Sequence, residues 1–405
     1  MGDSGAGEDE SRGQDYRAIA GQLVETAREA TDLSWAHCQQ TVQCVLHTLH
    51  SKLHLPHLRQ LQQCLAGDVL DLENCSDAVK LQDGLSQIVA MHGDMEERSW
   101  ALHEDEAAVT ELVRGVESVV QKADPRVPLR LVCSDGERAP LGCLVDLVQM
   151  EQRRTVRRAL VSLLSSLCLL SPRVPRLLLP SNLALELARD SLALLHRPEH
   201  DPTTTPLIVA ENLRLLALVF CGGEPMPCHF DQVLDDHWLA AVCRFPRTDT
   251  ALDTLLSFSL QFRSPPSNPV VRAISGTPQP SVLTQLLIDL ANRKTDPVWP
   301  YSDPNPSSRP HSVLKLLSDL LVAGDECCFY SNDLAVLLDI CLREVSDLSP
   351  CPLRTHFLEL LSLTLSHAPL SHATDEVRHT LQHLQSQENC PETDAKLCAQ
   401  MLQAV

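Results

Sequence analysis

Apolar residues recur at helical spacing along most of the chain, and the clearest example lies between residues 329 and 349. One apolar stripe repeats there at intervals of three and four residues: Leu334, Leu337, Leu338, Cys341, Val345 and Leu348. Val336 and Ile340 form a second stripe on nearly the opposite side. A helix that is apolar on two sides packs against neighbours on two sides. The stretch therefore predicts an inner helix of a stacked array, capped at its start by Ser331 or Asn332.

The same periodicity predicts helices of about ten to twenty residues across the chain, separated by proline-containing turns, and no strand. No tetratricopeptide or ankyrin signature repeats at a fixed period. Helices that recur about every 20 residues are typical of degenerate HEAT and armadillo arrays, whose repeats have about 40–47 residues. We therefore predict an all-α fold, specifically an armadillo/HEAT-like α-solenoid of degenerate helical repeats.

The pattern also predicts how the chain is divided. Residues 1–15 are rich in glycine and acidic residues and contain no apolar anchor, which is typical of a disordered acidic leader. Residues 16–405 are predicted to form a single armadillo-like helical domain. Three polar, proline-containing linkers are expected within it, near residues 196–206, 264–280 and 295–310.

The charge balance narrows the classes of partner. The chain carries 33 lysines and arginines against 53 acidic residues, a net charge of −20. Such a surface disfavours sequence-independent nucleic-acid binding and is repelled by anionic membranes. No signal peptide opens the sequence, and no apolar run is long enough to span a bilayer. We expect a cytoplasmic protein with a protein partner, no nucleic acid and no membrane insertion.

Four histidines stand at intervals of three and four residues and raise the question of a metal site: His47, His50, His54 and His57. Imidazoles one helical turn apart can share a metal ion. Pro56 interrupts the helix, however, and neither a carboxylate in register nor a CxxC pair accompanies the histidines. A solvated helix face is the preferred interpretation, and no metal is predicted.

No group of residues has the pattern of a catalytic site. Glu104, Asp105 and Glu106 are consecutive on one predicted helix, so their carboxylates point in different directions and cannot flank one substrate. Acidic residues in the first turns of a helix are favoured by its dipole, which accounts for them. The sequence contains no glycine-rich phosphate loop, no G-x-S-x-G and no H-E-x-x-H. We predict that the protein is not an enzyme and binds no cofactor.

The one local excess of positive charge is the run from residue 151 to residue 158. Its arginines stack in two columns at i, i+4, one made of Arg153 and Arg157, the other of Arg154 and Arg158. Such a patch can dock an acidic partner helix through bidentate guanidinium contacts. The alternative is neutralisation by neighbouring acidic residues of the same chain, which the net charge slightly favours.

Several stretches resemble one known family. The helix from Phe329-Tyr-Ser-Asn-Asp-Leu334 to Arg343-Glu-Val-Ser-Asp-Leu-Ser349 is similar to the signature of the leucine-rich C-terminal domain of the WISH/DIP family (NCK-interacting protein with SH3 domain). Further similar blocks occur in the family's order over roughly residues 80 to 370: Arg98–Glu106, Gln149–Glu151, Glu186–Asp190, Asp296–Val298 and Pro310–Lys315.

The resemblance implies an armadillo domain that binds the Arp2/3 complex and activates it without a preformed mother filament. The product would be a linear actin filament, and actin itself would be an indirect partner. Binding can activate the complex only if it favours the active arrangement over the inactive one. The rival hypothesis is an armadillo-type adaptor that binds other protein cargo and has no actin-nucleating activity. Whether the chain forms a homodimer is left open.

Candidate contact residues come from the chemistry of exposed positions rather than from the resemblance. They are the four arginines of the 151–158 run, Trp100 as an interface anchor, and the polar strip of the 329–349 helix, made of Asp339, Arg343 and Asp347. Asp339 and Arg343 also stand at i, i+4 with the acid first, a pair that supports a helix.

Overall fold

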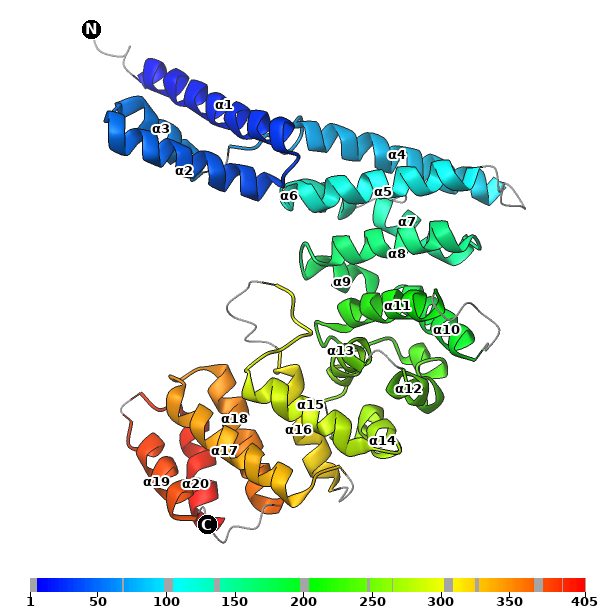
Figure 1. Ribbon diagram of the computed structural model, residues 1–405, viewed down its shortest axis with the longest axis vertical. Coiled ribbons are helices and arrows are strands. Elements are labelled where there is room, and N and C mark those ends of the chain that lie inside the picture. Colours follow the sequence, from blue (N-terminus) through cyan, green and yellow to red (C-terminus); the bar gives the residue numbers. More distant parts are fainter. Residues whose placement is uncertain are drawn as a thin grey trace. The chain divides into compact units, whose positions relative to one another are not determined.

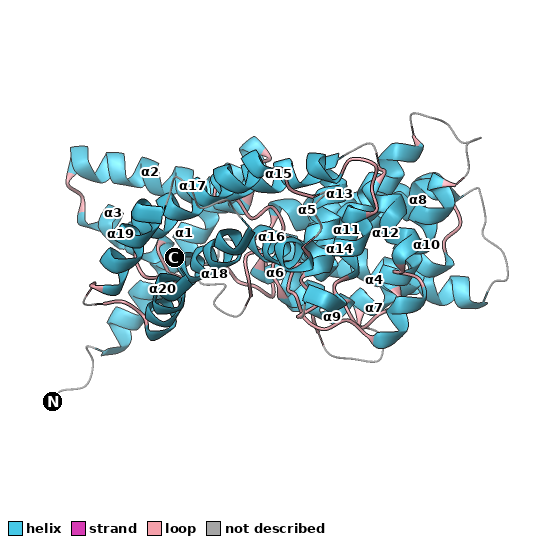
Figure 2. Ribbon diagram, turned by 90° about the horizontal axis from the view of Figure 1, so that it is seen from below, coloured by secondary structure: helices cyan, strands magenta, loops and turns pink. Residues whose placement is uncertain are grey.

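The computed structural model describes the backbone in eleven stretches: residues 6–67, 69–97, 105–134, 139–196, 204–245, 248–263, 265–301, 309–324, 328–367, 374–387 and 389–404. Within these stretches every regular element is a helix and no strand occurs, as Figure 2 shows. The all-α prediction is therefore confirmed for this part of the chain. The helices group into two compact units, residues 1–171 and 172–405.

The first unit contains eight α-helices in its described part: α1 (Ala6–Thr31), α2 (Trp35–Leu53), α3 (Pro56–Leu65), α4 (Ser76–Glu97), α5 (Glu106–Lys122), α6 (Arg126–Val132), α7 (Pro140–Met150) and α8 (Arg154–Cys168). The first three pack on one another, and α5 packs between α4 and α8 (Figure 1). Proline stands at the first position of α3 and of α7, where its missing N–H leaves no helical bond unmade.

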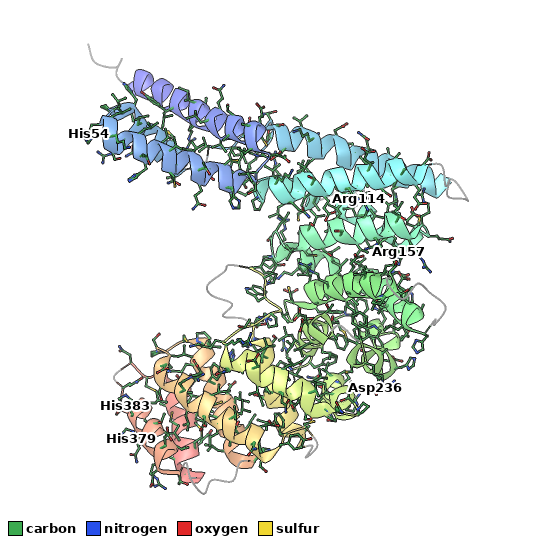
Figure 3. The ribbon with its side chains drawn as sticks, viewed as in Figure 1. His54, Arg114, Arg157, Asp236, His379 and His383 are labelled. Carbon is green, nitrogen blue, oxygen red and sulfur yellow. The ribbon has the colours of Figure 1, made fainter. Side chains whose placement is uncertain are left out.

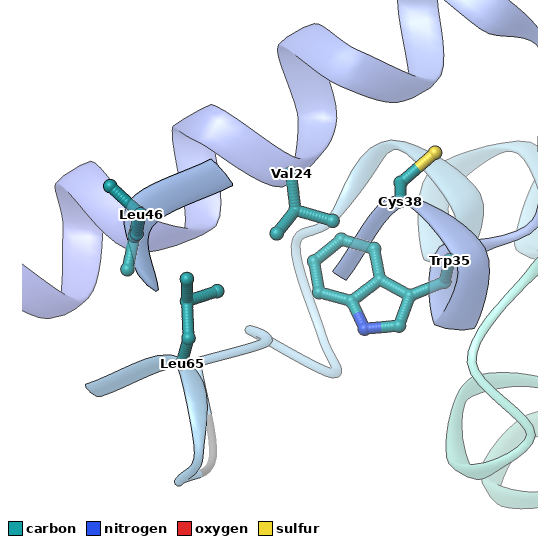
Figure 4. Packing of buried hydrophobic residues seen from close by; sticks show 6 residues of the cluster. Val24, Trp35, Cys38, Leu46 and Leu65 are labelled. Atoms are coloured by element: carbon teal, nitrogen blue, oxygen red, sulfur yellow. The ribbon is translucent and has the colours of Figure 1, made fainter. Parts of the chain in front are cut away.

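A small apolar core holds α1, α2 and α3 together (Figure 4). Trp35 and Leu46 of α2 meet Val24 of α1 and Leu65 of α3, and each of these side chains is at most 5% exposed. The α1–α2 turn is fixed by Ser34, whose side chain accepts a hydrogen bond from the backbone N–H of His37 at the start of α2. The buried apolar residues of α1, α2 and α3 thus pack mainly against one another.

The second unit contains twelve α-helices and two 3-10 helices in its described part: α9 (Arg173–Leu178), α10 (Leu183–Leu195), α11 (Thr205–Phe220), η2 (Cys228–Gln232), α12 (Asp236–Cys243), α13 (Thr248–Ser259), η3 (Pro265–Ser267), α14 (Pro269–Ser275), α15 (Pro280–Asn292), α16 (Ser312–Ala323), α17 (Ser331–Asp347), α18 (Pro352–His367), α19 (Thr374–Gln385) and α20 (Glu392–Ala404).

Within this second unit the helices pack in two rows. In one row α11 contacts α13, α13 contacts α16, α16 contacts α18, and α18 contacts α20. In the other row α12 contacts α14, α14 contacts α15, α15 contacts α17, and α17 contacts α19. Pairs such as α17 with α18 bury the apolar faces that the two rows turn toward each other.

The helix with the clearest apolar pattern, α17, is buried on one side only, although the sequence predicts two buried sides. Leu337, Leu338 and Ile340 are at most 5% exposed, whereas Val336 is 48% exposed. The predicted second stripe is therefore wrong at Val336. Positions four apart lie about 40° apart around a helix, and the edge of the buried sector passes between Val336 and Ile340. The start also differs, because Asp333 accepts a hydrogen bond from the backbone N–H of Tyr330, so that Tyr330 is the capping residue.

The predicted leader and linkers contain regular structure. The backbone of α1 begins at Ala6, inside the stretch 1–15, where alanine, glutamate and glutamine favour a helix. In the stretch 264–280, η3 and α14 replace the expected linker, and Val270 and Ile274 are completely buried. The boundaries of the leader and of a single domain from residue 16 to residue 405 stay predictions.

Candidate functional site

The column formed by Arg153 and Arg157 faces the interior of the first unit. Arg153 precedes α8 and is 8% exposed. Its guanidinium donates two hydrogen bonds to the carboxylate of Glu151, at 3.0 and 2.7 Å, and its backbone N–H donates a third at 2.8 Å. Burial alone would raise the pKa of Glu151, but these bonds hold it below its usual value. Arg153 is thus neutralised by an acidic residue of the same chain.

Arg157 has a similar internal role. Its guanidinium donates to the backbone carbonyl oxygens of Val148 and Glu151, at the carboxyl end of α7. A cation there stabilises the last carbonyl groups of a helix. Arg154 is exposed and Arg158 is half-buried. The four arginines therefore differ in exposure and do not form one surface.

A hollow of about 850 Å³ opens beside this column, on α5. Glu106, Glu111 and Arg114 line it, and Thr155 contributes from α8. Figure 3 labels Arg114 and Arg157 on the two helices. The charges in the hollow are mixed in sign, and Gly115 leaves its floor open. The hollow has no pair of groups in contrasting environments that could act as acid and base. Trp100, the predicted anchor, lies outside the described residues.

The polar strip of α17 is exposed as predicted, but its contacts differ from those expected. Asp339, Arg343 and Asp347 all face solvent. Arg343 donates to Asn292 of α15 at 2.8 Å and to the carboxylate of Glu344 at 2.8 Å. In the described structure no ion pair joins Asp339 to Arg343.

Glu344, which is 1% exposed, is the centre of this contact. Lys294, at the end of α15, lies 2.9 Å from its carboxylate. Burial would raise the pKa of Glu344, but Lys294 and Arg343 lower it. Arg343 therefore links α17 to α15, whereas Asp339 and Asp347 are exposed.

A buried polar network lies between α15 and α16, in a stretch predicted as a linker. Arg309 pairs with Asp296 at 2.9 Å and donates to the carbonyl oxygen of Cys221 at 2.7 Å, at the end of α11. Asp296 also accepts hydrogen bonds from the backbone and side chain of Ser312, at 3.0 and 2.6 Å. The guanidinium of Arg309 stacks over Trp299, 5.1 Å from the ring centre.

Two of the sequence blocks that carry the resemblance lie in this region. The block 296–298 contributes Asp296, and the block 310–315 contributes Ser312 and Lys315. Lys315 pairs at 2.5 Å with Asp319, which in turn accepts a hydrogen bond from Asn268 at the start of α14. These recognisable residues connect helices of the second unit. They determine its architecture and do not themselves present a contact surface.

Asp253 of α13 is the most perturbed carboxyl group among the described residues. Burial, reinforced by the negative charge of Asp249 one turn earlier, raises its pKa to about 7, while Arg214 of α11 acts in the opposite direction and Asp296 in the same one. No catalytic partner accompanies it. The group is a structural carboxyl held largely protonated below neutral pH.

Replacing Asp253 with asparagine should stabilise the second unit at alkaline pH. The pKa in the folded state is above the unfolded value, so the folded protein holds the proton more tightly, and stability falls as pH rises from about 4 through 7. At pH 8 the unfolding free energy of Asp253→Asn should therefore exceed that of the parent by about 1–2 kcal/mol, after allowance for solvent screening. Its melting temperature should be correspondingly higher. The difference should shrink at pH 5. Melting followed by circular dichroism at both pH values, with Asp249→Asn for comparison, checks this. An equal effect at both pH values would contradict it.

The histidine run does not form a metal site in the described structure. His47, His54 and His57 are exposed, and His54 ends α2 in the left-handed region with a φ of 53° (Figure 3). His57 stacks on Tyr16. Among the described residues, no group of three or more histidine, cysteine or acidic side chains could hold a metal ion. Within the same residues, no helix is long and apolar enough to cross a membrane.

Comparison with protein families identifies one part of the chain. Residues 246–382, from just before α13 into α19, match the leucine-rich domain of SPIN90/Ldb17. SPIN90 belongs to the WISH/DIP family, so the resemblance of the sequence is confirmed over these residues. The similar blocks before residue 246 lie outside the match. The family is not a catalytic one. The chain therefore carries, in residues 246–382, the leucine-rich domain of the SPIN90/Ldb17 (WISH/DIP) family.

Proposed function

We propose that the protein binds the Arp2/3 complex and activates it without a preformed mother filament, so that linear actin filaments are nucleated. The observation that carries the proposal is the SPIN90/Ldb17 leucine-rich domain in residues 246–382, since membership of this family suggests an Arp2/3 regulator. The protein acts in the cytoplasm, at the actin cytoskeleton. It does so as a binding protein, without catalytic residues or a cofactor.

The two rows of helices in the second unit support an armadillo/HEAT-like α-solenoid as the scaffold for this activity. Each row is a chain of neighbour-to-neighbour contacts, which is the arrangement that stacked helical pairs produce. A scaffold of this kind offers a long, rigid surface. Rigidity matters because a partner is activated only by a surface that fits its active arrangement better than its inactive one.

The proposed contact residues are Arg154, which is exposed, and Arg158, which is half-buried, in the first unit, and the exposed Asp339 and Asp347 on α17. Arg153, Arg157 and Arg343 support their own units, since their guanidinium groups bind Glu151, the end of α7 and Glu344 respectively. Trp100 is retained as a proposed anchor.

A pyrene-actin assembly assay tests the function. The purified chain, added to the Arp2/3 complex and monomeric actin without filament seeds or another activator, should shorten the lag before assembly. Single-filament microscopy should show unbranched filaments. If the lag is unchanged while the protein is folded, the activity is absent and the adaptor hypothesis takes its place.

The contact residues are tested in the same assay. Asp339→Lys with Asp347→Lys should raise the concentration needed for half-maximal activation by about tenfold, because two exposed charges are reversed at the surface. Glu392→Lys, a reversal at an exposed position of α20 outside the matched residues, is the control and should leave it unchanged. Equal behaviour of the two variants would remove the α17 strip from the contact surface.

A further inference from the structure

The hairpin formed by α2 and α3 differs in charge from the rest of the chain. From Ser34 to Gly67 the sequence contains no aspartate and no glutamate, whereas the whole chain has a net charge of −20. Lys52 and Arg59 give this segment a formal charge of +2. Five of the 17 histidines also lie in it. The hairpin is therefore a positively charged island on an acidic protein.

An exposed apolar stripe runs along the same hairpin. Val45, Leu49 and Leu53 follow one another at i, i+4 and i+8 on α2, and they are 51%, 38% and 56% exposed. Leu55, in the turn to α3, is 47% exposed. The stripe is about 12 Å long, since a helix rises 1.5 Å per residue.

The stripe adjoins the packed face of the three-helix bundle and extends it toward the end of α2. The core contacts of α2 are made by Trp35, Cys38 and Leu46, which are at most 5% exposed and lie on the side turned toward α1 and α3 (Figure 4). Leu49 and Leu53 continue the same side of α2 beyond Leu46, toward the end of the helix, and Val45 lies at its edge, yet all three stay exposed. Lys52 stands one position before the last of them, in the adjoining polar sector.

We propose that this surface, formed by Val45, Leu49, Leu53, Leu55 and Lys52 and named here the α2 stripe, binds an amphipathic helix of a partner protein whose leucine-type face is flanked by acidic residues. Apolar residues at i, i+4 and i+8 have the spacing of the anchor residues with which amphipathic helices bind in hydrophobic grooves. Lys52 and Arg59 favour an acidic partner, because α2 and α3 themselves carry positive charge and no acidic residue. A second copy of the same hairpin would bring like charges together.

Binding to a designed peptide tests the proposal without actin or the Arp2/3 complex. The probe is a fluorescent helical peptide of about 18 residues with leucines at the i, i+4 and i+8 positions and glutamates beside them. Its twin has lysines in place of the glutamates. In fluorescence anisotropy with the full chain, the glutamate peptide should bind at least about tenfold more tightly than the lysine peptide. The preference should weaken as salt is raised from about 0.05 to 0.5 M.

The variants assign the binding to the stripe. Val45→Ser, Leu49→Ser and Leu53→Ser together should reduce affinity for the glutamate peptide by at least about tenfold. A matched control replaces three comparably exposed apolar residues of the second unit, Leu177, Leu207 and Val282, with serine and should bind normally. Lys52→Glu with Arg59→Glu keeps the four apolar residues of the stripe and should reverse the preference between the two peptides. This second variant also serves if the serine variant does not fold.

Three results would overturn the proposal. The first is equal binding of both peptides, or binding that survives the serine substitutions. The second is self-association: the mass measured by light scattering rises with concentration in the parent and stays at the monomer value in the serine variant. The stripe would then join two copies of the chain. The third is stripe-dependent flotation with phosphatidylserine vesicles, which would assign the surface to an anionic membrane. The actin assay above is independent of all three.

Discussion

Replacing Asp394 with alanine should destabilise the second unit by about 3–5 kcal/mol, because it leaves the buried guanidinium of Arg354 without its counter-ion. Both side chains are 1% exposed. Arg354 of α18 donates to the Asp394 carboxylate of α20 at 2.9 Å, and Thr355 donates to its other oxygen at 2.7 Å. Gln387, between α19 and α20, accepts from the same guanidinium at 3.1 Å. Urea unfolding followed by far-UV circular dichroism measures the loss.

The control for this prediction is an ion pair of similar composition on the surface. Arg378 and Asp375 of α19 lie 3.4 Å apart with side chains 43% and 102% exposed. Exposed pairs contribute about 0–1 kcal/mol, so Asp375→Ala should change stability little. A double variant, Arg354→Met with Asp394→Leu, removes both charges and should recover much of the loss. Equal stability of Asp394→Ala and Asp375→Ala would show that the burial of the Arg354 pair does not matter.

The Asp394 prediction also concerns the extent of the folded unit. The match to the leucine-rich domain ends at residue 382, and Asp394 lies beyond it. At the other end, Arg309 and Gln261 of the matched part bond to the carbonyl oxygens of Cys221 and Phe220 at the end of α11. Helices on both sides of the matched residues thus satisfy polar groups inside them. Removing α20 should therefore destabilise the second unit by more than Asp394→Ala does, because the buried Cys398 and Met401 are lost as well.

The helical class of the fold was predictable because it depends on periodicity, which the sequence displays directly. Proline was the main source of error. The prolines of the stretch 264–280 predict a break, but Pro269 stands at the first position of α14 and Asn268 caps the helix by accepting from the N–H of Val270. At a first helical position proline costs no hydrogen bond and has a suitable φ. The distinction between a break and a start depends on the residues that follow, here the buried Val270 and Ile274.

The candidate site was predictable only in part, because spacing gives the direction of a side chain on its own helix and not the groups that it meets. Arg153 and Arg154 are adjacent in sequence and equally basic. Arg153 bonds to Glu151 in a turn whose geometry the sequence does not reveal and is buried, whereas Arg154 is exposed. Arg343 shows the same limit, since Glu344 and Asn292 bind it rather than Asp339. The sequence contains one indication of the Arg153 contact, since the acidic residue Glu151 stands two positions before it.

The sequence blocks that identify the family likewise give little information about the contact surface. Asp296, Ser312 and Lys315 stand in recognisable motifs: Ser312 at the start of α16 bonds to Asp296, and Lys315 of α16 bonds to Ser259 of α13. A buried polar group has few acceptable replacements, because its partners must still be satisfied. Surface residues are less constrained, so motifs recognised from sequence identify the fold more reliably than the contact surface.

Leu338→Asp should lower the free energy of unfolding of the second unit by at least about 4 kcal/mol, since it places an unpaired carboxylate among the apolar side chains between α17 and α18. Leu338 is 5% exposed. Val336→Asp, two residues earlier on the same helix, is the matched control. Val336 is 48% exposed, and valine and aspartate have similar helix propensities, so the change should stay within about 0.5 kcal/mol. Urea unfolding of both variants at pH 7.5 provides the measurement. Comparable losses in the two variants would mean that both stripes of α17 are buried, as the apolar pattern alone had predicted.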